Sequence, residues 1–107
     1  MKRTSHIHLI MMTTITHMMS TIIIMNKLIN EFDKIIRWPN KPTDKEFVIH
    51  WLSNKFYFEI KYSEKEVNKI LNRHHSFNDI ALLRRELISR KYMCRKDDGS
   101  EYWKANK

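Results

Sequence analysis

The scarcity of turn-forming residues is the feature that most limits what this chain can fold into. Its 107 residues include one glycine and two prolines, at Gly99, Pro39 and Pro42. Sharp reversals of the backbone depend largely on these residue types, so the chain has few places to turn. The length allows one small domain with a modest core. We therefore expect a mainly helical domain.

The spacing of apolar residues places the first two helices. One helical stripe begins after Asn26 and is ended by Pro39 and Pro42; its members are Leu28, Ile29, Phe32, Ile35 and Ile36. Thr43 is the expected N-cap of the next helix, with Glu46 as its capping-box partner. The buried face of this second helix is expected to hold Phe47, Val48, Trp51, Leu52 and Phe56.

The second half of the chain predicts a short strand and two more helices. Residues 57–62, "YFEIKY", are aromatic and β-branched, which favours an edge strand. Ser63 and Glu66 form a capping box for a third helix with Val67, Ile70 and Leu71 on its buried stripe. Ser76 with Asp79 is a further cap signal, which opens the helix containing Arg84 and Arg85.

Residues 92–104, "YMCRKDDGSEYWK", predict a β-hairpin with Asp98–Gly99 as its tight turn. This turn pairs Lys96 with Glu101, Arg95 with Tyr102 and Cys94 with Trp103. We expect the face with Tyr92, Cys94 and Trp103 to pack on the helices and the face with Arg95, Tyr102 and Lys104 to be exposed. Helices followed by a C-terminal hairpin predict a winged helix-turn-helix-like fold, with the helix before the hairpin as recognition helix.

Residues 1–25 contain no acidic residue and interrupt their apolar run with Thr, Ser and His. We interpret them as a disordered leader or as the product of a start codon assigned upstream of Met25, rather than as a membrane anchor. Residues 26–107 then form the winged-helix-like domain. The lone Cys94 excludes an internal disulfide and fits a cytoplasmic location.

The formal net charge of +8 favours a polyanionic partner, and we expect double-stranded DNA. At 100° per residue, Arg84 falls inside the apolar sector of its helix and Arg85 outside it, near Ser89. We therefore assign Arg84 to a structural ion pair with an acid from a neighbouring helix, which would be Glu66 only if the capping box is not formed. The expected DNA-binding residues are Asn78, Arg85, Ser89, Arg95, Lys96 and Lys104.

No catalytic arrangement is recognisable in the sequence. His74, His75, His50 and Cys94 lack the spacing of a zinc site, and phosphate-binding loops and nucleophile motifs are missing. We expect neither an enzyme nor a metal, a cofactor or a small-molecule substrate.

Four segments, "RWPNKP", "YSEKEVNKIL", "LLRREL" and "DGSEYW", resemble the bacterial domain of unknown function 2087 from about Ile35 to Lys104. Members occur alone or fused behind ArsR-like regulators, so the resemblance implies a winged-helix-like fold and an assignment as transcriptional regulator. The match extends to Arg37, Trp38, Pro39, Tyr62, Glu64, Glu66, Val67, Asn68, Leu71, Leu83, Arg84, Arg85, Glu86, Leu87, Gly99, Ser100 and Tyr102. The chain departs from the family in its leader and in "RKYMCR", which lacks the glycine that relatives often have there.

Two functions are compatible with these observations. The first is a DNA-binding transcriptional regulator. The second is a winged-helix protein-interaction or dimerisation module without direct DNA binding, in which the N-terminal helix would pair two copies as a homodimer. DNA binding predicts that Arg85, Arg95 and Lys104 share one continuous positive face.

Overall fold

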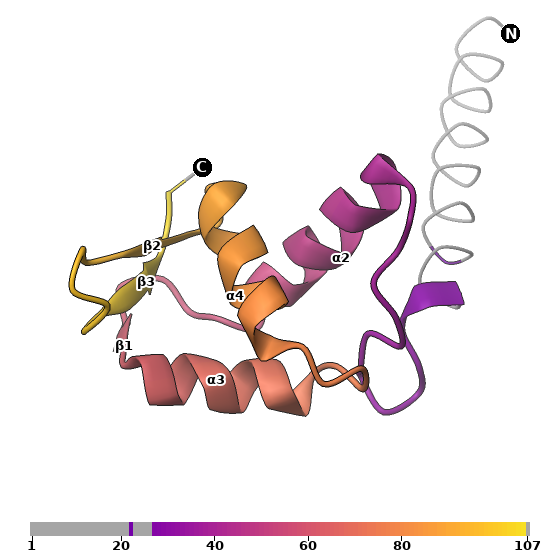
Figure 1. Ribbon diagram of the computed structural model, residues 1–107, viewed down its shortest axis with the longest axis horizontal. Coiled ribbons are helices and arrows are strands. Elements are labelled where there is room, and N and C mark those ends of the chain that lie inside the picture. The colour runs from indigo at the N-terminus through magenta and orange to yellow at the C-terminus, as the bar shows by residue number, and fades with distance from the viewer. Residues whose placement is uncertain (1–21, 23–26, 107) are drawn as a thin grey trace, which may run out of the picture.

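Three helices pack against one end of a small sheet in the computed structural model, which describes residue 22 and residues 27–106 (Figure 1). The order along the chain is α2 (Pro42–Ser53), β1 (Lys61–Tyr62), α3 (Glu64–Arg73), α4 (Ile80–Ser89), β2 (Met93–Arg95) and β3 (Tyr102–Lys104). The strands form an antiparallel sheet in the order β1-β3-β2. The expected leader, apart from Ile22, lies outside the described residues.

The predicted capping box of α3 is confirmed. The Ser63 hydroxyl accepts the N–H of Glu66 at 3.1 Å, and the Glu66 carboxylate accepts the N–H of Ser63 at 2.9 Å. Two N-terminal N–H groups that a helix leaves free are thus satisfied by one pair of side chains. Val67 and Leu71 are buried as expected, while Ile70 is partly buried.

The other two helices begin differently from the prediction. Pro42 is the first residue of α2, a position where its fixed φ and its missing N–H are tolerated. Lys41 occupies the N-cap position and makes no side-chain hydrogen bond to the helix. The prediction that Thr43 caps this helix is therefore wrong. Helix α4 is capped by Asp79, which accepts the N–H of Leu82 at 3.1 Å. Ser76 instead donates to the Ile35 carbonyl at 3.4 Å.

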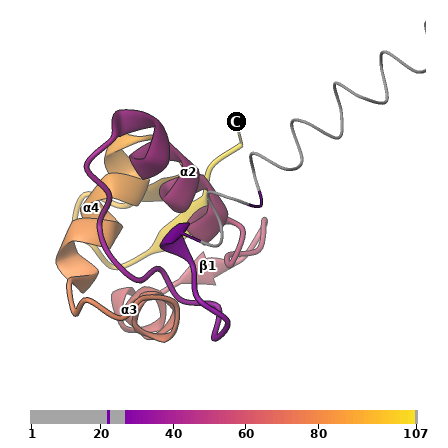
Figure 2. The ribbon, with the colours of Figure 1, turned by 90° about the vertical axis from the view of Figure 1, so that its right-hand side faces the viewer.

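The predicted helix after Asn26 is wrong over residues 29–36. The Asn30 side chain accepts the N–H groups of Phe32 and Lys34, and Asp33 has a φ of 62°, so the chain turns back on itself. Ile29 and Ile35 then pair across this turn, and Ile35 also bridges to His75. Figure 2 shows this segment passing α2 and reaching α3. The homodimer expected through such a helix stays a prediction.

The predicted register of the hairpin is confirmed, but its faces are reversed. Cys94 pairs with Trp103 and Arg95 with Tyr102, as expected. However, Met93 and Tyr102 are buried at 2% and 3% exposure, so the side bearing them packs on the helices. Cys94 and Trp103 lie on the other side and are only partly buried. The reversal follows from Met93, which lies on the Tyr102 side and adds a large apolar group to it.

The hairpin turn and the first strand also differ in detail from the prediction. Gly99 donates its N–H to the Lys96 carbonyl at 2.9 Å, so the reverse turn is centred on Asp97–Asp98 and Gly99 follows at a φ of +75°. The strand expected over residues 57–62 is reduced to β1, because Glu59 has a φ of 64° and interrupts the extended run. β1 does lie at the edge of the sheet, as predicted.

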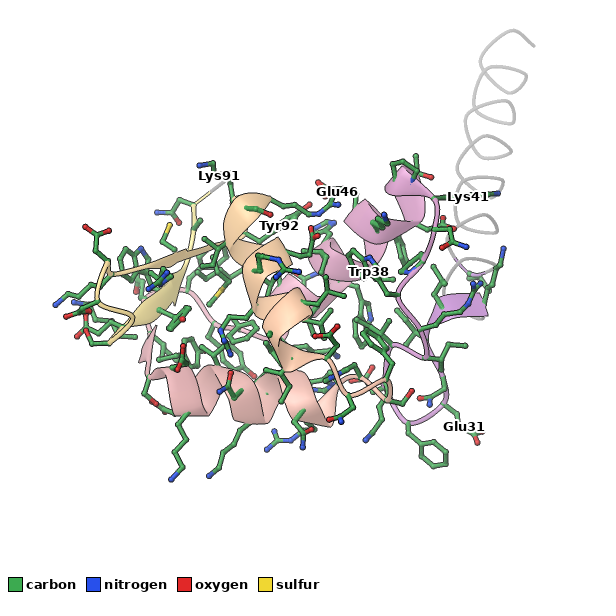
Figure 3. The ribbon with its side chains drawn as sticks, viewed as in Figure 1. Glu31, Trp38, Lys41, Glu46, Lys91 and Tyr92 are labelled. Atoms are coloured by element: carbon green, nitrogen blue, oxygen red, sulfur yellow. The ribbon has the colours of Figure 1, made fainter. Side chains whose placement is uncertain are left out.

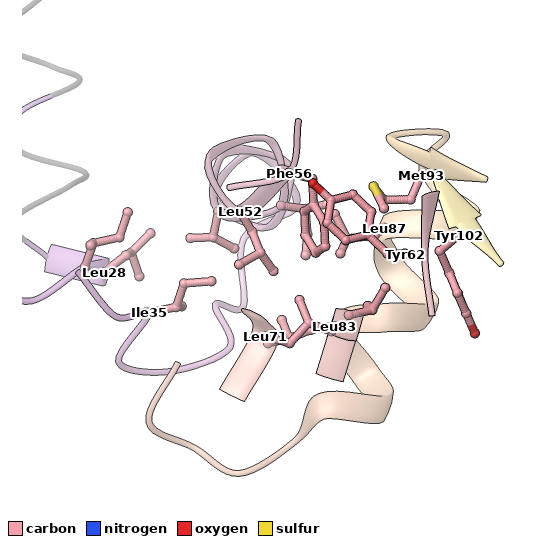
Figure 4. Packing of buried hydrophobic residues seen from close by; sticks show 14 residues of the cluster. Leu28, Ile35, Leu52, Phe56, Tyr62, Leu71, Leu83, Leu87, Met93 and Tyr102 are labelled. Carbon is pink, nitrogen blue, oxygen red and sulfur yellow. The ribbon is translucent and has the colours of Figure 1, made fainter. Parts of the chain in front are cut away.

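One apolar core joins all of these elements (Figure 4). It runs from Leu28 and Ile35 through the helices to the hairpin, and includes Val48, Ile49, Leu52, Phe56, Tyr62, Val67, Leu71, Leu83, Leu87, Met93 and Tyr102. Of the face predicted for α2, Phe47 and Trp51 are partly buried, and the buried Ile49 was not expected. The core fixes α4 between α2, α3 and β2, which positions the arginine pair.

Candidate nucleic-acid interface

The two adjacent arginines of α4 have different surroundings. Arg84 donates a hydrogen bond to the Asn68 side-chain oxygen at 2.6 Å, and its Nε lies 3.7 Å from a carboxylate oxygen of Glu64. Both partners belong to α3, so Arg84 connects the two helices. The Arg85 side chain is exposed. Successive side chains of a helix point in directions about 100° apart, so Arg84 faces α3 while Arg85 faces solvent.

Glu66 does not pair with Arg84, because its carboxylate is already held in the capping box. The bonds from the Ser63 backbone and hydroxyl hold the pKa of Glu66 below its ordinary value. Glu64, two residues earlier in the first turn of α3, is the acid that approaches Arg84. Asn68 lies one helical turn further on, so both groups lie on the face of α3 that meets α4.

A groove of about 370 Å³ lies between α4 and the hairpin. Ala81, Arg85 and Ser89 are spaced four residues apart and form one exposed stripe along α4. Arg95 of β2 lines the groove from the hairpin side. The remaining lining residues are Arg84, Ile88 and Tyr102. Three arginines therefore line one concave surface, and Arg95 also donates to the Asp97 carbonyl at 3.2 Å.

The charge of this groove is positive. Among the described residues, Glu64 is the acid that contacts its lining: it approaches Arg84 and accepts the hydroxyl hydrogen of Tyr102 at 3.1 Å. Burial, followed by this bond to Glu64, raises the pKa of Tyr102 above its ordinary value. One carboxylate against three guanidinium groups leaves an excess of two positive charges. Such a surface attracts phosphate groups.

Three of the six predicted DNA-binding residues are not brought to this groove. Asn78 is exposed just before α4, with a φ of 55°. Lys96 lines a second groove on the other side of the hairpin, where it lies 3.7 Å from Glu101. Lys104 lines that second groove too, so it does not share one face with Arg85 and Arg95 as expected. The reason is the direction of its side chain, because the Lys104 ammonium lies beside the Phe58 ring and the Phe56 carbonyl rather than beside α4.

Sequence reasoning missed the residues that orient α4 and the start of the hairpin. The Glu46 carboxylate accepts a bond from Arg90 at 3.0 Å and another from the Tyr92 hydroxyl at 3.0 Å (Figure 3). Arg90 also donates to Glu86 at 2.8 Å, and these bonds raise its pKa. The Glu86–Arg90 spacing of four residues was the available signal. The sequence predicts Glu46 in a capping box with Thr43, which does not form.

Two features are absent from the part of the chain that the structure describes. Residues 22 and 27–106 contain no group of three or more His, Cys, Asp or Glu side chains that could hold a metal ion. No helix among the same residues has the length and apolarity needed to cross a bilayer.

Comparison with known proteins gives one family. Searches of curated proteins and of solved structures gave no significant match. Residues 34–104 match the family described as "Uncharacterized protein conserved in bacteria (DUF2087)". The match spans α2 to β3, and so includes α4, the hairpin and every residue that lines the groove between them. Because the family match covers well over half of the chain, the chain belongs to this bacterial family.

Proposed function

We propose that this protein is a small winged helix-turn-helix protein that binds double-stranded DNA and acts in transcriptional control. In such proteins the second helix of a helix-turn-helix enters the major groove, and its side chains contact base edges and phosphates. Here α4 would be that helix, α3 the helix before it and the β2–β3 hairpin the wing.

The order of elements supports this proposal. α3 and α4 pack together across a short turn, residues 74–79, and the hairpin follows α4 directly. The first strand pairs with the last, which gives the sheet order β1-β3-β2. Winged-helix domains typically have this order: a helix, a strand, two helices, and a hairpin that pairs with the first strand. Fold alone does not establish function, so the proposal depends on the groove.

The groove between α4 and the hairpin is the observation that carries the proposal. It combines the exposed Arg85 and Ser89 of the helix with Arg95 of the adjacent strand. Arginine and serine are common partners of DNA phosphates, and arginine also reads guanine in the major groove. Ala81 keeps the N-terminal half of the stripe small, which allows a close approach of the helix to bases.

Binding of the full chain to random duplex DNA, followed by fluorescence anisotropy over a salt series, tests the proposal. We expect the affinity to fall steeply between about 50 and 200 mM salt, because bound phosphates release counterions. Arg85→Ala should weaken binding and make the salt slope shallower by about one. Arg73→Ala removes an exposed arginine of α3 outside the groove and should leave both quantities unchanged.

Two results would contradict the proposal. The first is an absence of binding at low salt by a folded protein. The second is equal weakening by Arg85→Ala and Arg73→Ala, which would mean that only net charge matters and that the groove is not the contact surface.

A further inference from the structure

A second, larger groove lies on the side of the sheet away from α4. Its volume is about 580 Å³, and it is formed by the segment Phe58–Lys61 and by the outer side of the hairpin. Strand β3 separates the two grooves: Tyr102 lines the groove between α4 and the hairpin, and Trp103 lines this second groove. A volume between about 300 and 1,000 Å³ is usual for small-molecule sites.

The lining of this groove exposes large apolar side chains. Phe58 is 52% and Ile60 44% exposed, and Trp103 is partly exposed opposite them. Between Phe58 and Ile60, Glu59 adopts a left-handed backbone conformation with a φ of 64°. This conformation is unfavourable for a residue other than glycine and is found more often at binding sites than elsewhere. The segment thus holds two apolar side chains toward solvent at a cost in free energy.

Among the described residues, the charges around the groove leave one lysine without a carboxylate partner. Lys61 and Lys96 both lie near the Glu101 carboxylate, at 3.6 and 3.7 Å. The Lys104 ammonium lies 4.4 Å from the centre of the Phe58 ring and 3.4 Å from the Phe56 carbonyl. Among the described residues, no carboxylate oxygen lies within 4 Å of it. Since Glu59 and Glu101 face three lysines here, one positive charge remains in excess.

We propose that this groove binds a small aromatic carboxylate. The aromatic body would pack against Trp103 and Ile60, and the carboxylate would pair with the Lys104 ammonium. A second copy of this basic chain would bring more positive charge to the same place. A single-stranded nucleic acid needs open ring faces for base stacking, but Lys104 covers a face of Phe58. The proposal does not depend on DNA binding.

Titration of the full chain with naphthoate, by calorimetry and by nuclear magnetic resonance of the tryptophan indole N–H signals, tests the proposal. We expect saturable binding of one ligand per chain, with the largest signal shift at Trp103 rather than at Trp38 or Trp51. Naphthylmethanol has the same ring system without the charge and should bind about fivefold more weakly, as expected for one exposed ion pair. Equal affinity for the acid and the alcohol would overturn the role of Lys104.

A pair of variants locates the charge. Lys104→Gln should reduce naphthoate affinity about fivefold and leave affinity for the alcohol unchanged. Lys65→Gln, on the exposed surface of α3 outside the groove, is the matched control and should bind as the wild type does. The indole signals require no substitution, so they test the site even if Lys104→Gln alters folding. Absence of saturable binding, or a shift centred on another tryptophan, would overturn the proposal.

Discussion

The imidazole of His75 accepts the backbone N–H of Asp79 at 2.9 Å, and thereby fixes the start of the helix that carries the arginine pair. His75 is buried, with 3% of its surface exposed, and its other ring nitrogen donates to the Leu71 carbonyl at 2.6 Å. One neutral side chain therefore joins the end of α3 to the N-cap of α4. The turn between the two helices is held from inside, without a glycine.

We expect His75→Ala to lower the free energy of unfolding by about 1–3 kcal/mol, because it leaves the N–H of Asp79 without its partner and leaves the Leu71 carbonyl with only the His74 N–H. Urea denaturation followed by circular dichroism measures this loss. Asn72→Ala, an exposed position on the same helix, is the control and should change stability by less than about 0.5 kcal/mol. Equal stability of His75→Ala and Asn72→Ala would show that the buried ring does not hold the turn.

Local signals in the sequence predicted α3 and the division of work between the arginines. The capping box needs only residues three apart, and the two faces of α4 follow from the helical repeat. Neither depends on distant parts of the chain. Contacts between helices were harder to predict. The sequence indicated that Arg84 pairs with an acid, but the identity of its partners, Glu64 and Asn68, depends on how α3 packs on α4.

The segment after Asn26 shows how a periodic pattern can mislead. Leu28, Ile29 and Ile35 are buried, as a helical stripe would require, but Phe32 is 71% exposed. Asn30 and Asp33 favour a tight turn, and the bonds of Ile35 to His74 and Ser76 stabilise it from another part of the chain. Because these partners lie about forty residues away, the spacing alone could not reveal them.

The hairpin shows a different limit. Its turn fixed the register, but the buried side depends on whether Met93 or Cys94 faces the helices, and both are suitable for burial. Arg95 lines the groove beside Arg85, whereas the long side chain of Lys104 reaches Phe58 and the Phe56 carbonyl. Of the residues predicted to bind DNA, Arg85, Ser89 and Arg95 therefore lie together in one groove, and their role in DNA binding stays a prediction.

Substitution of the two arginines should separate architecture from surface. We expect Arg84→Ala to lower the free energy of unfolding by about 1–2 kcal/mol, because the Asn68 oxygen loses its charged donor. Arg85→Ala, its exposed neighbour, should change stability by less than about 0.5 kcal/mol. Thermal denaturation of both variants measures the difference. Unchanged stability of Arg84→Ala combined with a loss of DNA affinity would overturn the structural assignment of Arg84.

The capping box makes stability depend on acid pH. The pKa of Glu66 is lowered in the folded protein, so its carboxylate stabilises the fold above the unfolded pKa, about 4.3 for a glutamate. This contribution is lost as pH falls through the folded pKa. The stability advantage of the wild type over Glu66→Gln should therefore shrink on acidification below about pH 4. Denaturation of both proteins across this range checks the result; an advantage that stays constant or grows would contradict it.

The hydroxyl of Tyr102 provides the opposite test at alkaline pH. Burial and the bond to Glu64 raise its pKa in the folded protein. Its proton therefore stabilises the fold below the unfolded pKa of about 10, and this stability is lost as pH rises through the folded value. In a titration that follows tyrosinate absorbance, Tyr102→Phe should remove part of the signal from the tyrosines that lose their protons at the highest pH.

Glu64→Gln serves as the companion variant, because it removes the charge but keeps an acceptor near the Tyr102 hydroxyl. The late ionisation should then move to lower pH without reaching that of an exposed tyrosine, since burial is the larger cause of the raised pKa. Tyr92 also has a raised pKa, from burial and its bond to Glu46, and its ionisation should not move. A late phase that Tyr102→Phe leaves intact would show that the hydroxyl is not held against Glu64 in solution.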